Sequence, residues 1–264
     1  MKLTTTAVLL LSSLLVLGCN DSSDDDDDAT TDDTTTETDG GDGDSTTTYS
    51  QSALMSDSID TDTGELSFPL GSTYSTGTLS LNLRMSTDET ETAYIGIYGE
   101  DVNDDYKMVD IKLDESYADG ADDFVGVRLR GDVDYDSDTL TDIAADTWVN
   151  FSITWDSTTT PGTYSVSIDG TDYGTFNMYV DSDNSAGEYY SIEYIGLRIS
   201  SNGNTTVSDY PLYIDDITVT SESTELFSDD FESYDVDYVL GQDTDDYYTK
   251  TYGAVISDDQ NATE

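Results

Sequence analysis

The chain has 264 residues, of which 58 are Asp or Glu and 8 are Lys or Arg, giving a net charge of -50. So acidic a surface repels nucleic acid and anionic lipid headgroups, which argues against DNA or RNA as a partner, and it suits a salty medium, where screening shortens the range of self-repulsion. The chain contains no His, the commonest general base and a frequent metal ligand, and this removes most triad and zinc mechanisms.

The N-terminus has the features of an export signal. Lys2 gives a short basic start, the apolar core over 7–17 is too short to span a bilayer as a helix, and Leu15–Cys19 resembles the lipobox of bacterial lipoproteins. The resemblance implies a signal peptide over 1–18, a lipidated Cys19 and a lipid-anchored protein on the outer membrane of a Gram-negative bacterium, exposed at the cell surface. The alternative is an ordinary secretory signal with an incidental Cys. Cys19 is the only cysteine, so an internal disulfide is excluded.

An acidic linker follows the cysteine over 19–48. It consists mainly of Asp, Thr, Ser and Gly, includes the run Asp24–Asp28, and has almost nothing apolar to bury, so we expect a disordered segment extended by self-repulsion. We interpret it as a spacer between the membrane and a folded domain. The alternative, a calcium sponge, is the weaker hypothesis because loose carboxylates bind hard cations weakly.

Short alternating segments over 49–221 predict one all-β domain. The clearest lies at 148–170, where apolar residues alternate with polar ones before and after a loop at 156–162, and Asp169-Gly170 then closes a tight turn. Similar alternation occurs at 79–85, 94–98, 107–113, 125–130, 195–199 and 212–219. No long stretch has helical periodicity. About ten short strands of this kind favour an antiparallel two-sheet β-sandwich, a jelly roll.

The segment at 222–264 allows two interpretations. Its apolar stretches at 226–234, 239–241 and 254–257 either add a strand to the first sandwich or open a second β module that is cut short. We favour the second interpretation.

The sequence WVNFSITWD…GTYSVSIDG, followed by YIGLRIS and LYIDDITV, resembles the concanavalin A-like, laminin-G-type jelly rolls. That group includes carbohydrate-binding modules and polysaccharide lyases of secreted bacterial proteins. The resemblance implies glycan binding on the concave sheet and, often, one structural calcium ion. FSDDFESY resembles the first strand of such modules, although here it follows the apparent last strand.

The four arginines all lie on the polar phase of their strands, together with one Asn and two Tyr. The residues are Arg84, Arg128, Arg130, Arg198, Asn82, Tyr94 and Tyr98. If their strands share one sheet, they form a surface suited to an acidic polysaccharide such as alginate, because Arg matches carboxylates and Tyr offers a stacking face. The alternative is that these arginines pair with neighbouring Asp and Glu, each pair contributing about 0.2–1 kcal/mol.

Acidic clusters suggest structural calcium. Asp134, Asp136 and Asp138 lie in DVDYDSDTLTD, which offers alternate oxygen ligands but lacks the Gly and terminal Glu of an EF-hand. A second cluster lies at 181–184, and Asp215 with Asp216 forms a third. The family resemblance implies that aspartates of the last strand help to hold the ion.

Catalysis is a further hypothesis. The paired-acid signature of laminarinase-like jelly rolls is absent. The resemblance to polysaccharide lyases implies a lyase without His as an enzyme hypothesis, with Tyr94 or Tyr98 as base and acid and Arg84 or Arg128 neutralising the uronate. The sequence therefore predicts a surface-displayed polysaccharide-binding lipoprotein that prefers an acidic glycan. The alternatives are such a lyase and a structural adhesin or matrix protein.

Overall fold

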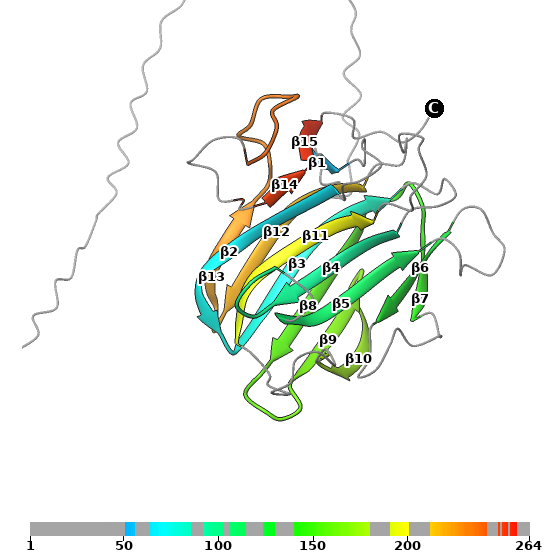
Figure 1. Ribbon diagram of the computed structural model, residues 1–264. Coiled ribbons are helices and arrows are strands. Elements are labelled where there is room, and N and C mark those ends of the chain that lie inside the picture. Colours follow the sequence, from blue (N-terminus) through cyan, green and yellow to red (C-terminus); the bar gives the residue numbers. More distant parts are fainter. Residues whose placement is uncertain are drawn as a thin grey trace, which may run out of the picture. The chain divides into compact units, whose positions relative to one another are not determined.

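Fifteen strands form two antiparallel sheets in the part of the chain that the structure, a computed structural model, describes (Figure 1). That part comprises residues 51–55, 64–85, 92–102, 106–114, 124–129, 140–179, 191–200, 212–241, 248, 250–252 and 254–257. The chain divides into two compact units, Met1–Thr46 and Thr47–Glu264, and every described residue belongs to the second. None of the described residues forms a helix long and apolar enough to cross a membrane.

Sheet A has eight strands in the order β10-β9-β8-β3-β12-β1-β15, with β13 paired to β12 outside this path. Its strands are β1 (Ser52–Met55), β3 (Thr76–Met85), β8 (Val149–Asp156), β9 (Thr163–Ile168), β10 (Thr171–Asn177), β12 (Leu212–Ser221), β13 (Thr224–Asp229) and β15 (Ala254–Ser257).

Sheet B has seven strands in the order β14-β2-β11-β4-β5-β6-β7. Its strands are β2 (Gly64–Tyr74), β4 (Thr92–Tyr98), β5 (Lys107–Asp114), β6 (Phe124–Leu129), β7 (Thr141–Ala144), β11 (Ile192–Ser200) and β14 (Lys250–Tyr252).

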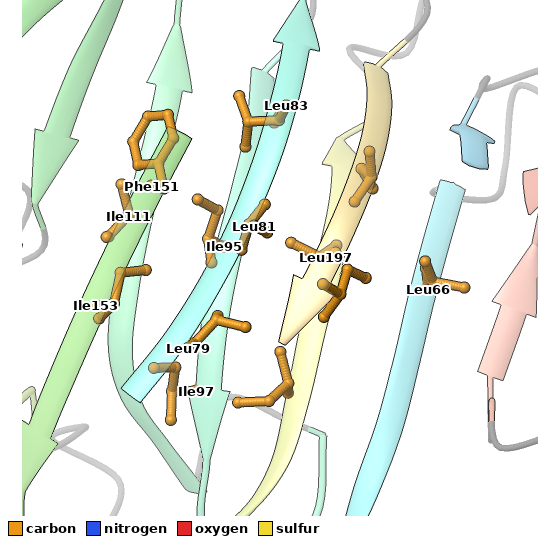
Figure 2. Close-up of a cluster of buried hydrophobic side chains, with 14 of the residues drawn as sticks. Leu66, Leu79, Leu81, Leu83, Ile95, Ile97, Ile111, Phe151, Ile153 and Leu197 are labelled. Carbon is orange, nitrogen blue, oxygen red and sulfur yellow. The ribbon is translucent and has the colours of Figure 1, made fainter. Parts of the chain in front are cut away.

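The core lies between the two sheets and is built from the apolar phase of each strand. Leu79, Leu81 and Phe151 of sheet A face Ile95 and Leu197 of sheet B, and all five are at most 1% exposed (Figure 2). Because strand side chains alternate between faces, burial of this phase sends the intervening polar residues to the outer face of each sheet. The predicted all-β, two-sheet antiparallel sandwich is confirmed.

The tight turn predicted at Asp169-Gly170 joins β9 to β10. Both residues have positive φ, 47° for Asp169 and 73° for Gly170. Two consecutive positive φ angles are typical of a type I′ hairpin turn, which favours Asp-Gly because Gly adopts that backbone without a steric cost.

The C-terminal segment belongs to the same sandwich in the described residues. β13 pairs with β12 and β15 pairs with β1 in sheet A, while β14 pairs with β2 in sheet B. The Phe227 ring stacks on Phe68 of β2 with 4.0 Å between centroids, and Phe231 is fully buried. The sandwich therefore extends past the predicted boundary at 221. The described part of 222–264 adds strands to the first sandwich, and the separate second module that we favoured must be corrected.

Candidate functional site

Five polar side chains lie in one row across the outer face of sheet B. The strand register pairs Glu65 with Arg198, Arg198 with Tyr94, Tyr94 with Lys112, and Lys112 with Arg128. Each lies between buried residues of its own strand, and the row runs across β2, β11, β4, β5 and β6. We call these five residues the sheet B row. Three of the chain's 8 Lys and Arg residues lie in it.

Neighbouring groups contact two cations of this row, Arg198 and Lys112. The Arg198 guanidinium lies over the Tyr94 ring with 4.6 Å from Cζ to the centroid. The Lys112 ammonium contacts the Asp114 carboxylate at 2.5 Å. Arg198, Tyr94 and Lys112 are half-buried, whereas Arg128 is buried. The accessible part of the row is therefore an Arg–Tyr–Lys triplet on three adjacent strands, with the equally half-buried Glu65 next to Arg198.

A second basic group lies on the same face. Lys107 forms an ion pair with Asp110 at 3.2 Å, and both side chains are buried. Its Nζ lies 6.0 Å from the Tyr98 ring centroid. Burial, and then the nearby Asp110 carboxylate, raises the pKa of the Tyr164 hydroxyl above its ordinary value. This cluster is an internal ion pair with little access to a ligand.

Sequence reasoning missed both lysines because it considered only the arginines. Lys112 lies between the core residues Ile111 and Leu113, so the alternation could have placed it on the outer face. Lys107 could not have been placed in this way, because a bulge makes it pair with Tyr98 although Ile97 pairs with Val109.

The Tyr98 side chain packs against two glycines, Gly96 and Gly196. A Cβ on Gly96 would lie 2.3 Å from the Tyr98 hydroxyl oxygen, and one on Gly196 would lie 3.0 Å from its ring. Tyr98 is only 6% exposed, so its ring has little room to move. The predicted ligand contact by Tyr98 is thus limited to a small exposed edge, while Tyr94 is the more accessible tyrosine of β4.

The Gly96→Ala substitution should therefore displace the Tyr98 ring and lower the free energy of unfolding by about 1–3 kcal/mol, as overpacking does. Urea denaturation followed by near-ultraviolet circular dichroism would measure both the loss and the changed environment of the ring. Gly196→Ala is the graded comparison, because its added methyl meets the ring at a larger distance and should cost less. Equal stability of wild type and Gly96→Ala would contradict this packing.

Arg84 and Asn82 lie on β3 in sheet A, so the predicted residues do not share one sheet. The Arg84 guanidinium lies between two rings, with 4.0 Å from Cζ to the Tyr213 centroid and 5.5 Å to that of Trp148, and Arg84 is 3% exposed. Asn82 donates from Nδ2 to Asp216 at 2.9 Å and accepts from Asn150 at 2.9 Å. The single Arg/Tyr/Asn surface must be corrected to a sheet B group with Tyr94 and Arg198 and a separate, buried sheet A group.

Several predicted residues lie outside the described residues. They are Arg130, Asp134, Asp136, Asp138 and Cys19. The cluster predicted at 181–184 lies outside them as well. Asp142, at the end of the DVDYDSDTLTD motif, is exposed on β7.

Asp215 and Asp216 lie at a bulge in β12, between the register pairs of Asp215 with Asn82 and of Thr218 with Ser80. Asp216 has a φ of 50° and is exposed, whereas Asp215 is 2% exposed and accepts a hydrogen bond from the Asp216 amide at 2.7 Å. Burial raises the pKa of Asp215 to about 7, and repulsion from Asp216, Glu232 and Asp230 adds to the effect. Burial, with repulsion from Asp230 and Glu232, also raises the pKa of Asp216.

A pocket of about 230 Å³ adjoins this bulge, lined by residues of β12, β13 and the following turn. Its lining residues include Asp216, Asp229 and Asp230. Asp229 accepts hydrogen bonds from the hydroxyls of Tyr248 at 2.8 Å and Tyr234 at 3.1 Å. The oxygens at this edge are the ligand type that calcium prefers. However, no three acidic side chains converge closely enough to hold a metal ion anywhere in the described residues.

Comparisons with known proteins found neither a matching family model nor a matching curated protein. Among solved structures, the chain is similar to a sialidase, with a TM-score of 0.49 and 12% identity over 64% of this chain and 15% of that one. It is similar to an alginate lyase of Pseudomonas aeruginosa, with a TM-score of 0.41 and 13% identity over 57% of this chain and 68% of that one. An alginate lyase of Alteromonas sp. 272 gives a TM-score of 0.41 and 14% identity over 64% of this chain and 87% of that one.

Likenesses at this level do not identify an activity. Strand order and register define the class instead: an antiparallel jelly-roll β-sandwich with a basic and aromatic row on the outer face of sheet B.

Proposed function

We propose that this protein binds an acidic polysaccharide, with alginate as the model ligand, on the outer face of sheet B. The observation that carries the proposal is the arrangement of Arg198, Tyr94 and Lys112 side by side on β11, β4 and β5 in a chain with a net charge of -50. Arg presents a fork of donors that matches a carboxylate, Lys a compact positive charge, and Tyr a stacking face with a hydroxyl.

The spacing of the row supports a polymer rather than a single sugar. Neighbouring strands lie about 4.8 Å apart, so cations on β11 and β5 are separated by about twice that distance. A polyuronate lying across the strands would present carboxylates at comparable intervals. The neighbours of Arg198 and Lys112 oppose the proposal, because a ligand must compete with the Tyr94 ring, with Asp114 and with Glu65, the register partner of Arg198.

Replacing Arg198 and Lys112 by Gln should reduce retention on immobilised alginate about tenfold or more, because each charge-assisted hydrogen bond contributes about 1.5–3 kcal/mol. Affinity electrophoresis at several NaCl concentrations would measure this, and wild-type retention should weaken as salt rises. Thr171→Glu/Thr224→Glu is the charge-matched control, since it also makes the chain two units more negative but at exposed positions of sheet A. Equal retention of all three proteins would refute the proposal.

A polysaccharide lyase is the second candidate, and the position of Tyr94 between Arg198 and Lys112 favours it. In such a reaction the Tyr94 phenolate would take the proton next to the uronate carboxylate, and the C–O bond to the glycosidic oxygen would break as a C=C bond forms. Tyr94 would then give that proton to the departing oxygen, while a cation stabilises the developing charge. The products would carry a new double bond. Absorbance of unsaturated ends in the ultraviolet separates the lyase from the binder, since binding alone releases none.

We further propose that the protein is a lipoprotein held at the bacterial outer membrane through Cys19 and exposed at the cell surface, with 19–48 as a spacer. The lipobox-like sequence supports this proposal. Mass spectrometry of the mature N-terminus would detect the acyl groups, and an unmodified Cys19 would refute it.

We also propose a structural calcium ion at the Asp215–Asp216 edge. The oxygen ligands and the mutual repulsion of the carboxylates there support the ion, whereas their failure to converge opposes it.

A further inference from the structure

The outer face of sheet A differs chemically from that of sheet B. Its two central rows consist of hydroxyl side chains only. The register aligns Thr220, Thr78, Thr154 and Ser165 in one row, across β12, β3, β8 and β9. It aligns Thr218, Ser80, Ser152 and Ser167 in the adjacent row. We call these eight residues the hydroxyl face.

This face is open to solvent and ordered by its own contacts. Thr154 is exposed and the other seven residues are half-buried. Thr78 and Thr154 share a hydrogen bond of 2.9 Å between their hydroxyl oxygens, and Asn150 donates to Ser80 at 3.4 Å. The backbone of each strand is fixed by a neighbour on both sides, so the hydroxyls form a regular grid. They lie about 4.8 Å apart along a row and about 6.8 Å apart between rows.

The composition of the face selects the class of ligand. Only about a quarter of the chain is Ser or Thr, yet every position of these two rows on β12, β3, β8 and β9 is one of them. Beyond these four strands the register continues one row to the exposed Glu225 of β13 and the other to the exposed Asp172 of β10, so acidic residues lie at the ends of the rows. Without a cation, the face offers nothing to a polyanion. A second copy of the chain would bring another net charge of -50, which opposes self-association through this surface. A hydroxyl both donates and accepts hydrogen bonds, which suits another hydroxyl-rich and uncharged surface.

We propose that the hydroxyl face binds an extended, uncharged polysaccharide. The interval along a row is close to the length of one extended pyranose residue, so a chain lying along a row meets one hydroxyl per strand. The eight residues form a grid because they lie on four adjacent strands. Thr218, at one edge of the grid, also lines the pocket between β12, β13 and the turn after β13. A polymer or an insoluble polysaccharide surface therefore fits it better than a free monosaccharide does. The two outer faces would then hold an acidic glycan on sheet B and a neutral one on sheet A.

The test is depletion of the full chain from solution by microcrystalline cellulose and by insoluble xylan, at a salt concentration that screens the net charge. We expect the wild type to be depleted by at least one of them. Ser152→Glu/Thr154→Glu and Ser152→Lys/Thr154→Lys should both lose binding at least tenfold, because either charge replaces one hydroxyl in each row. Thr171→Glu/Thr224→Glu, at exposed hydroxyls outside the rows, should bind like the wild type. Thermal melts would confirm that every variant folds.

The pair of opposite charges makes the test specific. Tighter binding by the Lys variant with loss in the Glu variant would show an anionic ligand and overturn the proposal, as would a wild type that neither solid depletes. A wild-type dimer that sedimentation finds and the Glu variant lacks would assign the face to a second copy and also overturn it. Alginate retention should be unchanged in these variants, so failure here is distinguishable from failure of the sheet B proposal.

Discussion

Replacing Phe231 by Ala should lower the free energy of unfolding by about 3–5 kcal/mol, the range measured for truncating a buried Phe. Phe231 is fully buried, stacks on Tyr248 with 6.4 Å between centroids, and donates its amide to Asp229 at 2.9 Å. The Phe231 ring belongs to the aromatic cluster that joins the C-terminal segment to Phe68 of β2. Tyr248 connects the two, because its ring also contacts Phe68 edge-on with 5.9 Å between centroids. Urea denaturation at constant salt would give the difference.

Val236→Ala is the matched control for this prediction. Val236 lies five residues further along the same segment and is 41% exposed, so its truncation should change the stability by no more than about 0.5 kcal/mol. If Phe231→Ala were as stable as Val236→Ala, the C-terminal segment would not belong to the core of the sandwich.

Alternation along the sequence predicted which face of a strand each residue occupies, but not which sheet the strand joins. Arg84 and Arg198 show the same alternation, Leu-Arg-Met and Leu-Arg-Ile, yet β3 pairs with β8 and β12 in sheet A while β11 pairs with β2 and β4 in sheet B. Pairing between distant strands is decided by the packing of the whole domain, which a single-strand pattern does not contain. The predicted strands were therefore right and the single arginine surface was not.

Bulges limited the prediction further. An extra residue in one strand reverses the side-chain phase beyond it. At β12 the core position moves from Ile214 to Ile217 across the bulge, whereas strict alternation from Ile214 would have placed Asp216 in the core; Asp216 is instead exposed.

The place of the C-terminal segment in the core could not be predicted for another reason. The Phe231 side chain is buried although the residue lies in a turn and has a φ of 56°. The Tyr248 side chain is buried although the residue lies outside the strands, so neither residue belongs to a period-2 pattern. An apolar residue in a turn gives no periodic signal, and only its tertiary contacts show that it belongs to the core.

Replacing Asp215 by Asn should raise the stability at pH 8 in the absence of calcium and leave it nearly unchanged at pH 4. The folded protein holds the Asp215 proton up to a pKa of about 7, because burial disfavours the carboxylate, whereas an unfolded Asp loses its proton near the ordinary value of 3.8. Between these two pH values the folded state binds more protons, so wild-type stability falls as pH rises through this window. Each pKa unit corresponds to about 1.4 kcal/mol, so the shift limits the gain to about 4 kcal/mol. The Asp215→Asn substitution would remove the part of this slope that Asp215 contributes, while Asp216 and Asp229, whose pKa values burial also raises, would keep theirs. The oxygen of the new amide side chain would still accept the hydrogen bond from the Asp216 backbone.

Calcium should reverse the order of the two proteins. If the ion binds beside Asp215 with the millimolar to sub-millimolar dissociation constants of extracellular sites, about 5 mM calcium should stabilise the wild type at pH 8 by about 1–2 kcal/mol and should stabilise Asp215→Asn much less. Thermal melts of both proteins at pH 4 and pH 8, each with calcium or with chelator, form the complete experiment. A wild type that loses more stability than Asp215→Asn between pH 4 and pH 8, but does not respond to calcium, would make Asp215 a destabilising buried acid and would remove the ion from the structure. A calcium response that survives in Asp215→Asn would move the ion to another place. Equal pH slopes of the wild type and Asp215→Asn would contradict the burial of the Asp215 carboxylate itself.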